Sequence, residues 1–311
     1  MLGKDSDELP NPGQLFPTGL SPLDRHSAAG SIGHRISRNR LPRPFLKWAG
    51  GKAQLLRYLV PLAHAAQSVG TYHEPFVGGG ALFFELSRLG LIKRAVLSDI
   101  NRSLMDSYLG VRDHIEHVLV ILGRHREFHS EDYYYEIRRS TPADIAERAA
   151  RVIYLNKTGY NGLFRENRRG EFNVPFGRYI DPPIRDESNL RATHAALQQT
   201  ELLNEGFQEV LDRVSSGDLV YFDPPYMPVS TTSSFTSYSA GGFREAEQKQ
   251  LAEVVAELDA RDIRVMVSNS FHPLIIRLYR QYNIREVLAS RAVNSHPGRR
   301  GKVKELLITN F

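Results

Sequence analysis

The apolar run LVYF is followed directly by four residues that could carry out chemistry, Asp223, Pro224, Pro225 and Tyr226. A carboxylate and the backbone carbonyl of Pro224 can each accept one hydrogen of an amine, which localises the lone pair of its nitrogen. The prolines restrict the backbone and fix the direction of that carbonyl, and the tyrosine ring can stack on a base. These residues suit methyl transfer to the exocyclic amine of adenine, which depends on alignment and electrostatics. The alternative is a structural turn that ends a strand.

A second candidate site is the glycine turn in HEPFVGGGALFFEL, which has the form strand, turn, helix. Gly78 and Gly80 would let a ligand approach the backbone, and the helix offers free N–H groups. Asp99 ends the next apolar run and could accept the ribose hydroxyls of a nucleoside cofactor. Glu74 could contact the positively charged methionine part of S-adenosylmethionine. The alternatives are a glycine-rich surface loop, a strand-capping Asp99 and a helix-dipole partner in Glu74.

Dinucleotide cofactors would need a similar turn, but the phosphate-binding pattern G-x-G-x-x-G is not present here. S-adenosylmethionine has no pyrophosphate and does not need that pattern. The sequence therefore favours S-adenosylmethionine as the cofactor and disfavours a nucleotide-dependent oxidoreductase.

Cysteine is absent from the chain, which excludes disulfides and thiolate metal sites. It also excludes methylation of cytosine carbon 5, which needs a cysteine nucleophile. Methyl transfer to an amine needs no covalent enzyme intermediate, and we expect no metal.

Hydrophobic residues make up 41% of the chain, enough for a globular core, but no apolar run is long enough to cross a membrane. The N-terminus has acidic residues where a signal peptide has basic ones. We expect a soluble cytoplasmic protein that associates with the nucleoid.

Basic residues are concentrated in two segments of this chain, whose net charge is +5. Residues 151–185 contain seven Arg and Lys against three acids, and residues 285–304 contain six against one. This distribution suits contact with the phosphates of a nucleic acid.

Apolar runs typical of strands alternate with helical stretches from residue 44 onward. We expect strands at TYHEPFV, AVLSDI, LVYF, RVMVSNS and KELLITN, which predicts an α/β sheet. Residues 101–150 have helical spacing, whereas the Gly- and Arg-rich block 159–185 predicts loops and a hairpin. Because this block interrupts the sheet, we expect residues 120–200 to be an inserted domain. Residues 1–43 are expected to be a disordered basic leader.

Seven short blocks occur in the order found in a known family: FLKWAGGK, EPFVGGG, SDIN, NKTGYNGLFREN, GEFNVPFGRY, FDPPY and FTSY. With these blocks, residues 45–311 resemble the Dam/DpnM group of DNA adenine methyltransferases, in the D12 class (alpha group), which modify GATC. The resemblance implies a Rossmann-like S-adenosylmethionine-dependent methyltransferase sheet, formed by residues 44–119 and 201–311. It also implies that residues 120–200 are a mainly helical target-recognition domain, which carries a β-hairpin and binds double-stranded DNA.

The resemblance implies roles at the cofactor site. Trp48 and Lys52 would hold the cofactor together with Asp99, and Phe207 would meet its adenine through the backbone. The cofactor-binding set predicted in this way is Trp48, Lys52, Glu74, Phe76, Gly78, Gly80, Asp99, Phe207 and Asp223. The alternative for Trp48 is a core aromatic residue.

The resemblance also implies DNA contacts. Tyr160 would wedge beside a flipped base, Arg165 would read a guanine in the major groove, and Lys47 would reach another guanine. Arg178, Arg168 and Arg169 would contact phosphates. The predicted DNA-binding set is Lys47, Tyr160, Asn161, Leu163, Arg165, Pro175, Arg178 and Tyr179. The alternative for Lys47 is a solvated charge, and for Arg168 and Arg169 an exposed hairpin turn.

Several questions stay open at the level of sequence. Enzymes that methylate glutamine or RNA also use a proline-proline-aromatic turn but would not need the 159–185 block, and a non-catalytic DNA-binding protein would not need Asp99 or Asp223. The C-terminal block NSHPGRRGKVKELLITNF is closer to the DpnM branch, so the site could be GATC or a longer relative such as GATATC. A role in restriction-modification, repair or regulation is equally open, and no obligate protein partner is evident.

Overall fold

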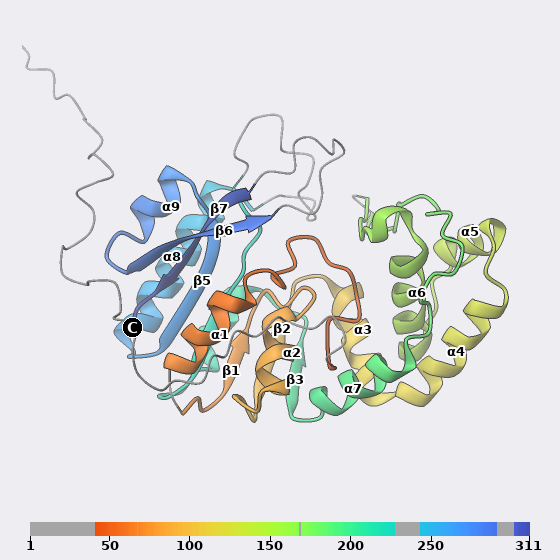
Figure 1. Cartoon of the computed structure of the whole chain (residues 1–311), viewed down its shortest axis with the longest axis horizontal. Coiled ribbons are helices and arrows are strands. Elements are labelled where there is room, and N and C mark those ends of the chain that lie inside the picture. The colour runs from red at the N-terminus through yellow and green to blue at the C-terminus, as the bar shows by residue number, and fades with distance from the viewer. Residues whose placement is uncertain (1–40, 67, 168, 228–242, 291–301) are drawn as a thin grey trace, which may run out of the picture. The chain divides into compact units, whose positions relative to one another are not determined.

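The computed structural model describes residues 41–66, 68–167, 169–227, 243–290 and 302–311 (Figure 1). The expected leader lies almost wholly outside these residues. So do Arg168, the FTSY motif and part of the basic segment 285–304. No helix of the described residues is long and apolar enough to span a bilayer.

Seven strands form one sheet in the order β3-β2-β1-β4-β5-β7-β6. All neighbours pair in parallel except β7, which is antiparallel to β5 and to β6. This confirms the predicted α/β fold with a Rossmann-like sheet. The strands are β1 (Tyr72–Glu74), β2 (Ala95–Ser98), β3 (Thr200–Leu203), β4 (Leu219–Phe222), β5 (Arg264–Ser270), β6 (Asn283–Ser290) and β7 (Lys302–Thr309).

The position of strand β4 inside the sheet explains why its sequence is apolar throughout. All four of its residues are buried, with Leu219 and Tyr221 in one core cluster and Val220 and Phe222 in another. Because successive side chains point to opposite faces of a sheet, a strand covered on both faces reads as a continuous apolar run.

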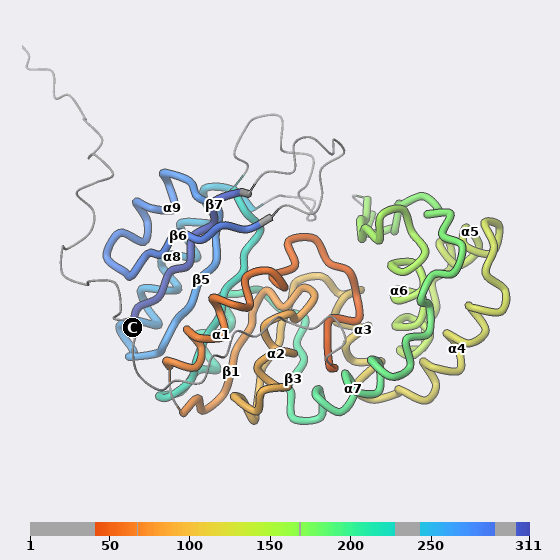
Figure 2. Tube along the Cα trace, in the orientation of Figure 1, coloured from red at the N-terminus to blue at the C-terminus, as the bar shows by residue number. Residues whose placement is uncertain are grey.

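Helices cover both faces of the sheet. The helices α1 (Leu56–Ala65) and α2 (Ala81–Arg88) share the first core cluster with Leu219 and Tyr221. The opposite face is covered by the 3-10 helix η3 (Phe207–Asp212), by α8 (Glu245–Ala260) and by α9 (Pro273–Leu278). The Cα trace in Figure 2 follows this alternation of strand and helix.

The chain between β2 and β3 is mainly helical, as its spacing predicted. Figure 1 shows most of these helices grouped beside the β3 edge of the sheet. Asn101, Ser130, Asp144 and Asp186 each start one of them by accepting a backbone N–H at its N-terminus. The elements are α3 (Arg102–Asp113), α4 (Ile115–Glu127), α5 (Glu131–Arg139), α6 (Ile145–Thr158), η2 (Tyr160–Gly162) and α7 (Glu187–Leu197).

The predicted hairpin at 159–185 is held by two isolated antiparallel bridges, Gly159 with Phe176 and Glu166 with Phe172. Residues 175–177 carry no named strand, so backbone pairing here is sparse. Side chains from the helices therefore have to support this segment.

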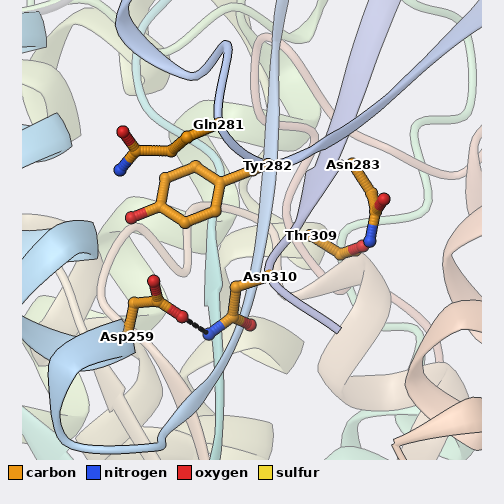
Figure 3. Close-up of a pocket in the computed structure, with 6 residues that line it drawn as sticks. All are labelled: Asp259, Gln281, Tyr282, Asn283, Thr309 and Asn310. Atoms are coloured by element: carbon orange, nitrogen blue, oxygen red, sulfur yellow. Dashed lines mark hydrogen bonds between the residues drawn. The ribbon is translucent and has the colours of Figure 1, made fainter. Parts of the chain in front are cut away.

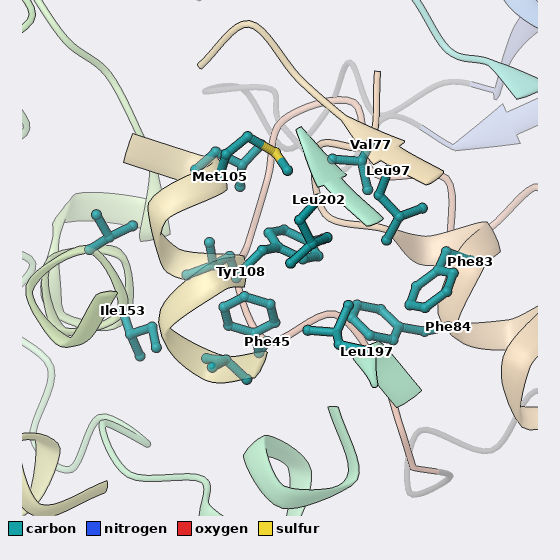
Figure 4. Close-up of a cluster of buried hydrophobic side chains, with 14 of the residues drawn as sticks. Phe45, Val77, Phe83, Phe84, Leu97, Met105, Tyr108, Ile153, Leu197 and Leu202 are labelled. Atoms are coloured by element: carbon teal, nitrogen blue, oxygen red, sulfur yellow. The ribbon is translucent and has the colours of Figure 1, made fainter. Parts of the chain in front are cut away.

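Tyr108 of α3 joins the helices to the sheet in one core (Figure 4). It is fully buried, and its ring meets that of Phe45 edge-on at a centroid distance of 5.0 Å. Ile153 of α6 and Phe83 of α2 belong to the same cluster. The apolar core thus continues from the sheet into the helices.

Candidate active site

Three predicted acids lie at the same edge of the sheet, where the parallel strands end. Glu74 is the last residue of β1, Asp99 follows β2, and Asp223 follows β4. The strand order reverses between β1 and β4. Ligands of open α/β sheets bind at the carboxyl ends of the strands at such a reversal, so the topology brings the cofactor and catalytic predictions to one place.

The side chain of Asp223 is 17% exposed, and its carboxylate lies against a cation. Its Oδ1 atom is 2.8 Å from Nζ of Lys52 and accepts a 2.6 Å hydrogen bond from the Ser268 hydroxyl. Burial raises the pKa of Asp223, while the charge of Lys52 and these hydrogen bonds pull it down. Lys52, predicted as a cofactor contact, is thus the ion-pair partner of the predicted catalytic carboxylate.

The rest of the catalytic turn is held by side chains from other elements. The Tyr226 hydroxyl donates to Glu305 of β7 at 2.7 Å, and Nζ of Lys52 lies 4.4 Å from the Tyr226 ring centroid. Nε2 of Gln248, a fully buried residue of α8, donates to the Pro225 carbonyl at 3.1 Å.

Ser268, Gln248 and Glu305 were not predicted from the sequence. For Ser268 a signal existed, because VMVSNS places polar residues inside an otherwise apolar strand. Gln248 and Glu305 lie among other polar residues of α8 and β7, where nothing marks them out.

The glycine turn has the backbone conformation that its sequence requires. Gly78 and Gly80 have φ angles of 47° and 66°, in the left-handed region that favours glycine. A Cβ atom on Gly78 would lie 2.9 Å from Cδ1 of Trp48, and one on Gly80 would lie 2.7 Å from Oη of Tyr108. Tyr108 also donates a 3.1 Å hydrogen bond to the Gly78 carbonyl. The turn is therefore closely packed as well as strained for any other residue.

Asp99 and Glu74 are acids without a cationic partner among the described residues. Asp99 accepts the backbone N–H of Gly78 at 3.2 Å and of Asn101 at 2.9 Å, yet burial raises its pKa to about 6. Glu74 is 3% exposed and accepts a hydrogen bond from Tyr72 at 2.9 Å. Burial, reinforced by the negative charge of Asp223, raises the pKa of Glu74 to about 8. A positively charged ligand at this edge would stabilise the charged forms of both carboxyl groups.

Aromatic residues lie on and against the segment between β1 and the glycine turn. Phe76 stacks on Phe207 at a centroid distance of 5.3 Å. Trp48 is partly buried against the glycine turn and stacks on Phe164 at 4.8 Å. Trp48 thus lies between the glycine turn and the hairpin segment, a position compatible with either of its predicted roles.

Lys47 is tied to the η2 turn by one buried amide. Oδ1 of Asn156 accepts the Lys47 N–H at 2.8 Å, while Nδ2 donates to the Lys47 carbonyl at 2.9 Å and to the Gly162 carbonyl at 3.2 Å. Nζ of Lys47 also donates to the carbonyl of Asn161, which has a φ of 56°. Two predicted DNA contacts, Lys47 and Asn161, are therefore adjacent, although 114 positions separate them.

The hairpin segment presents its predicted DNA-binding side chains to solvent. Tyr160 is 53% exposed, and its N–H donates to the Pro175 carbonyl at 2.8 Å. Nε of Arg165 donates to Oδ1 of Asn173 at 2.7 Å. Leu163 differs, because it packs partly against the core. The other exposed members of the predicted set are Lys47, Asn161, Pro175, Arg178 and Tyr179.

The backbone under these side chains is anchored from α5. The hydroxyl of Tyr134 donates to the Val174 carbonyl at 3.0 Å, and Nη1 of Arg138 donates to the same oxygen at 3.1 Å. Helical residues thus replace the missing ladder of a regular hairpin.

A pocket of about 300 Å³ lies elsewhere (Figure 3). It is lined by residues at the end of β7 and the start of β6, such as Thr309 and Asn283. Thr309 pairs with Met266 in the first half of β5, so this pocket is at the amino end of the parallel strands. It is not the predicted site.

Comparison with known proteins gives a consistent match along the chain. Residues 48–293 match a family described as D12 class N6 adenine-specific DNA methyltransferase. The Type II methyltransferase M1.LlaDCHI of Lactococcus lactis subsp. cremoris is 38% identical over 89% of this chain and 98% of its own length. For the Type II methyltransferase M.MjaIII of Methanocaldococcus jannaschii the identity is 40%, over 86% and 99%. For the DNA adenine methylase of Escherichia coli strain K12 it is 36%, over 85% and 94%.

Among solved structures, the precorrin-6y C5,15-methyltransferase of Geobacter metallireducens covers 86% of this chain and 98% of its own. Its TM-score of 0.37 and identity of 12% are too low to support a conclusion.

Proposed function

Since the chain belongs to the D12 class of N6 adenine-specific DNA methyltransferases, its substrate is adenine in DNA. We propose that it takes the methyl group from S-adenosylmethionine and that it acts on an adenine turned out of the duplex, within GATC.

The residues of the glycine edge fit this cofactor. Gly78 and Gly80 give the turn its left-handed backbone conformation, which would present the turn to the ligand, and the carboxylate of Asp99 would accept the ribose hydroxyls. Glu74 would balance the ammonium group of the methionine part, which supplies the positive charge that this buried acid lacks. Trp48, Phe76 and the Phe207 backbone would flank the adenine. When bound, S-adenosylmethionine supplies an electrophilic methyl group on a sulfonium.

The catalytic turn would activate the amine by accepting its hydrogens. The carboxylate of Asp223 would take one and the carbonyl of Pro224 the other, which localises the lone pair on the nitrogen toward the methyl group. Tyr226 would stack on the base. The methyl group would pass from the sulfonium sulfur to the nitrogen, and the proton lost by the nitrogen would pass to Asp223 or to solvent.

The helical segment would read the DNA. We propose that residues 120–200 form the target-recognition domain and that residues 44–119 and 201–311 form the catalytic domain. Tyr160 and Asn161 would fill the gap left by the everted base, at a cost of a few kcal/mol for unstacking, with Leu163 beside them. Arg165 and Lys47 would read guanines, with Pro175 and Tyr179 on the same hairpin. Arg178 and Arg169 would hold phosphates.

The observation that best supports the proposal is the meeting of Glu74, Asp99 and Asp223 at the strand reversal, beside a glycine turn that tolerates no side chain. Asp223→Ala should lower kcat by about 10²–10³-fold or more, as for loss of one essential electrostatic contact, while DNA affinity stays within a few-fold. Methylation assays and DNA-binding titrations measure both, with the exposed helix residue Glu253→Ala as the matched control. Normal turnover of the Asp223 variant would refute the assignment.

The sequence GATC is proposed on the resemblance to Dam/DpnM enzymes and on relatives named DNA adenine methylase. Relatives named Type II methyltransferases support a restriction-modification role. Expression in a methylation-free host, followed by base-resolution mapping of methyladenine, should show methylation at GATC. Methylation confined to a longer site such as GATATC would contradict this.

A further inference from the structure

The catalytic turn offers four acceptors, but an amine has only two hydrogens to donate. These acceptors are Oδ1 and Oδ2 of Asp223 and the carbonyl oxygens of Pro224 and Pro225. A turn in which all four were available could hold the amine in several ways, and most of them would misdirect its lone pair. Two of the four are already occupied by buried side chains.

Ser268 occupies the first of these. Val267 pairs with Phe222 across the parallel strands β5 and β4, which places Ser268 beside Asp223. The Ser268 hydroxyl is completely buried and donates to Oδ1 of Asp223 at 2.6 Å. Because that hydroxyl has only one hydrogen, the 2.9 Å contact between Tyr221 and Ser268 must be a donation from Tyr221. Lys52 binds the same carboxylate oxygen.

Gln248 occupies the second. Its Nε2 donates to the Pro225 carbonyl, while its Oε1 accepts a 2.9 Å hydrogen bond from Nδ2 of Asn269. Gln248 and Asn269 are both completely buried. The Asn269 contact orients the glutamine amide, so that its nitrogen faces the turn.

We propose that Ser268 and Gln248 are positioning residues that select Oδ2 of Asp223 and the Pro224 carbonyl as the two acceptors of the amine. This inference rests on the proposed function of the catalytic turn. Among the described residues, no hydrogen bond is seen to the Pro224 carbonyl or to Oδ2 of Asp223. Both positioning residues come from elements outside the turn, β5 and α8, which pack together in the second core cluster.

A positioning role has a specific kinetic signature. Neither side chain is exposed, so neither can touch DNA or cofactor, and their loss should act on kcat and leave KM for both substrates unchanged. A merely structural role would instead lower the melting temperature and the fraction of active enzyme, without changing the kcat of the molecules that fold.

Ser268→Thr and Ser268→Val provide a matched pair, because the two side chains have nearly the same shape and differ in the hydroxyl. Single-turnover rates, normalised to active sites titrated with tight-binding DNA, should be about 10-fold to 100-fold lower for the Val variant than for the Thr variant. The KM values for DNA and for S-adenosylmethionine should agree within about three-fold. Ser107→Ala, which removes an equally buried hydroxyl that donates to a backbone carbonyl in α3, should keep the wild-type kcat.

Gln248→Met and Gln248→Glu test the second contact. Met removes the donor, and an ionised Glu places a second acceptor against the Pro225 carbonyl, so both should lower kcat by about 10-fold or more. Protonated Glu regains a donor, so the deficit of the Glu variant relative to wild type should shrink as pH falls.

Equal rates for Ser268→Thr and Ser268→Val, or a change in KM instead of kcat, would overturn the inference. The proposed function would still stand in that case, provided that Asp223→Ala is inactive. An active Asp223→Ala enzyme would instead overturn the proposed function itself.

Discussion

The acids at the strand ends and the arginines of the hairpin segment, residues 159–185, differ in burial. Glu74 and Asp99 lie in the protein, where burial raises their pKa values to about 8 and about 6. Arg165 and Arg178 are exposed to solvent, on a segment whose described residues form two isolated backbone bridges. Burial makes a charge costly and responsive to its partner, whereas exposure leaves it screened until a ligand arrives.

This difference separates two tasks. At the sheet edge, the fold sets the protonation and direction of each group before any ligand binds, as chemistry requires. On the hairpin segment, the fold fixes the backbone through contacts such as that of Tyr134 with Val174 and leaves the side chains of the proposed DNA contacts exposed to solvent. Substitutions at the edge should therefore change chemistry and stability, and those on the segment should change DNA binding or sequence choice and leave stability nearly unchanged.

The largest effect expected, after that of Asp223→Ala, is that of Lys52→Met. Burial raises the pKa of Asp223 and the Lys52 charge opposes this rise, so removing the charge should raise that pKa further. Because the amine needs an ionised carboxylate as acceptor, kcat at pH 7 should fall by about 10-fold to 100-fold and partly recover at higher pH. A pH–rate profile measures this shift, with the exposed Lys93→Met as control. If the acidic limb of the pH–rate profile did not move, Lys52 would not control the protonation of Asp223.

A comparable effect, of a different kind, is expected for Arg165→Ala. Loss of one bidentate base contact should cost about 1–3 kcal/mol of discrimination, while the free energy of unfolding stays within about 0.5 kcal/mol. Rates on matched and mismatched duplexes measure the discrimination. Arg169→Ala should instead weaken binding equally on all sequences and reduce the salt dependence by about one charge. If Arg165→Ala behaved in that way too, the hairpin would contact only the backbone at this position.

The smallest effect expected is on the stability of the ligand-free protein. The folded pKa values of Glu74 and Asp99 lie above their unfolded values, so their stabilising contribution is complete below about pH 4 and is lost as pH rises toward 8. The free energy of unfolding should fall over this window, as measured by urea denaturation. Glu74→Gln should flatten this dependence, whereas the exposed Glu127→Gln should not. A stability that rises with pH in both variants alike would show that other groups dominate.

The sequence placed the acids well because each follows an apolar strand closely. Asp223 comes directly after LVYF, and Asp99 directly after AVLS, so a local pattern was enough. The partners of the catalytic turn could not be found in this way. Ser268, Gln248 and Glu305 lie 45, 23 and 79 positions from the residues they hold, and only the strand order brings them together.

Two strands were also not predicted, for a physical reason. In β3, only one of the four residues is buried, so no apolar run marks it. The other, β6, is the last strand at the opposite edge of the sheet, where one side lacks a neighbour and the pattern weakens. The hairpin segment was predicted from its composition. Its support by Tyr134 and Arg138 could not be predicted from the sequence.

The Asn156 amide has a consequence for engineering new specificities. Its three hydrogen bonds join the backbone of Lys47 to that of Gly162. The residues around Lys47 and the η2 turn therefore form one connected structural unit. In a chimera that takes only the block 159–185 from a relative, the foreign turn would not match the position of Lys47. Grafts that carry the residues around Lys47 and the end of α6 together with the block should keep the register of Lys47 and Arg165, the two proposed guanine contacts.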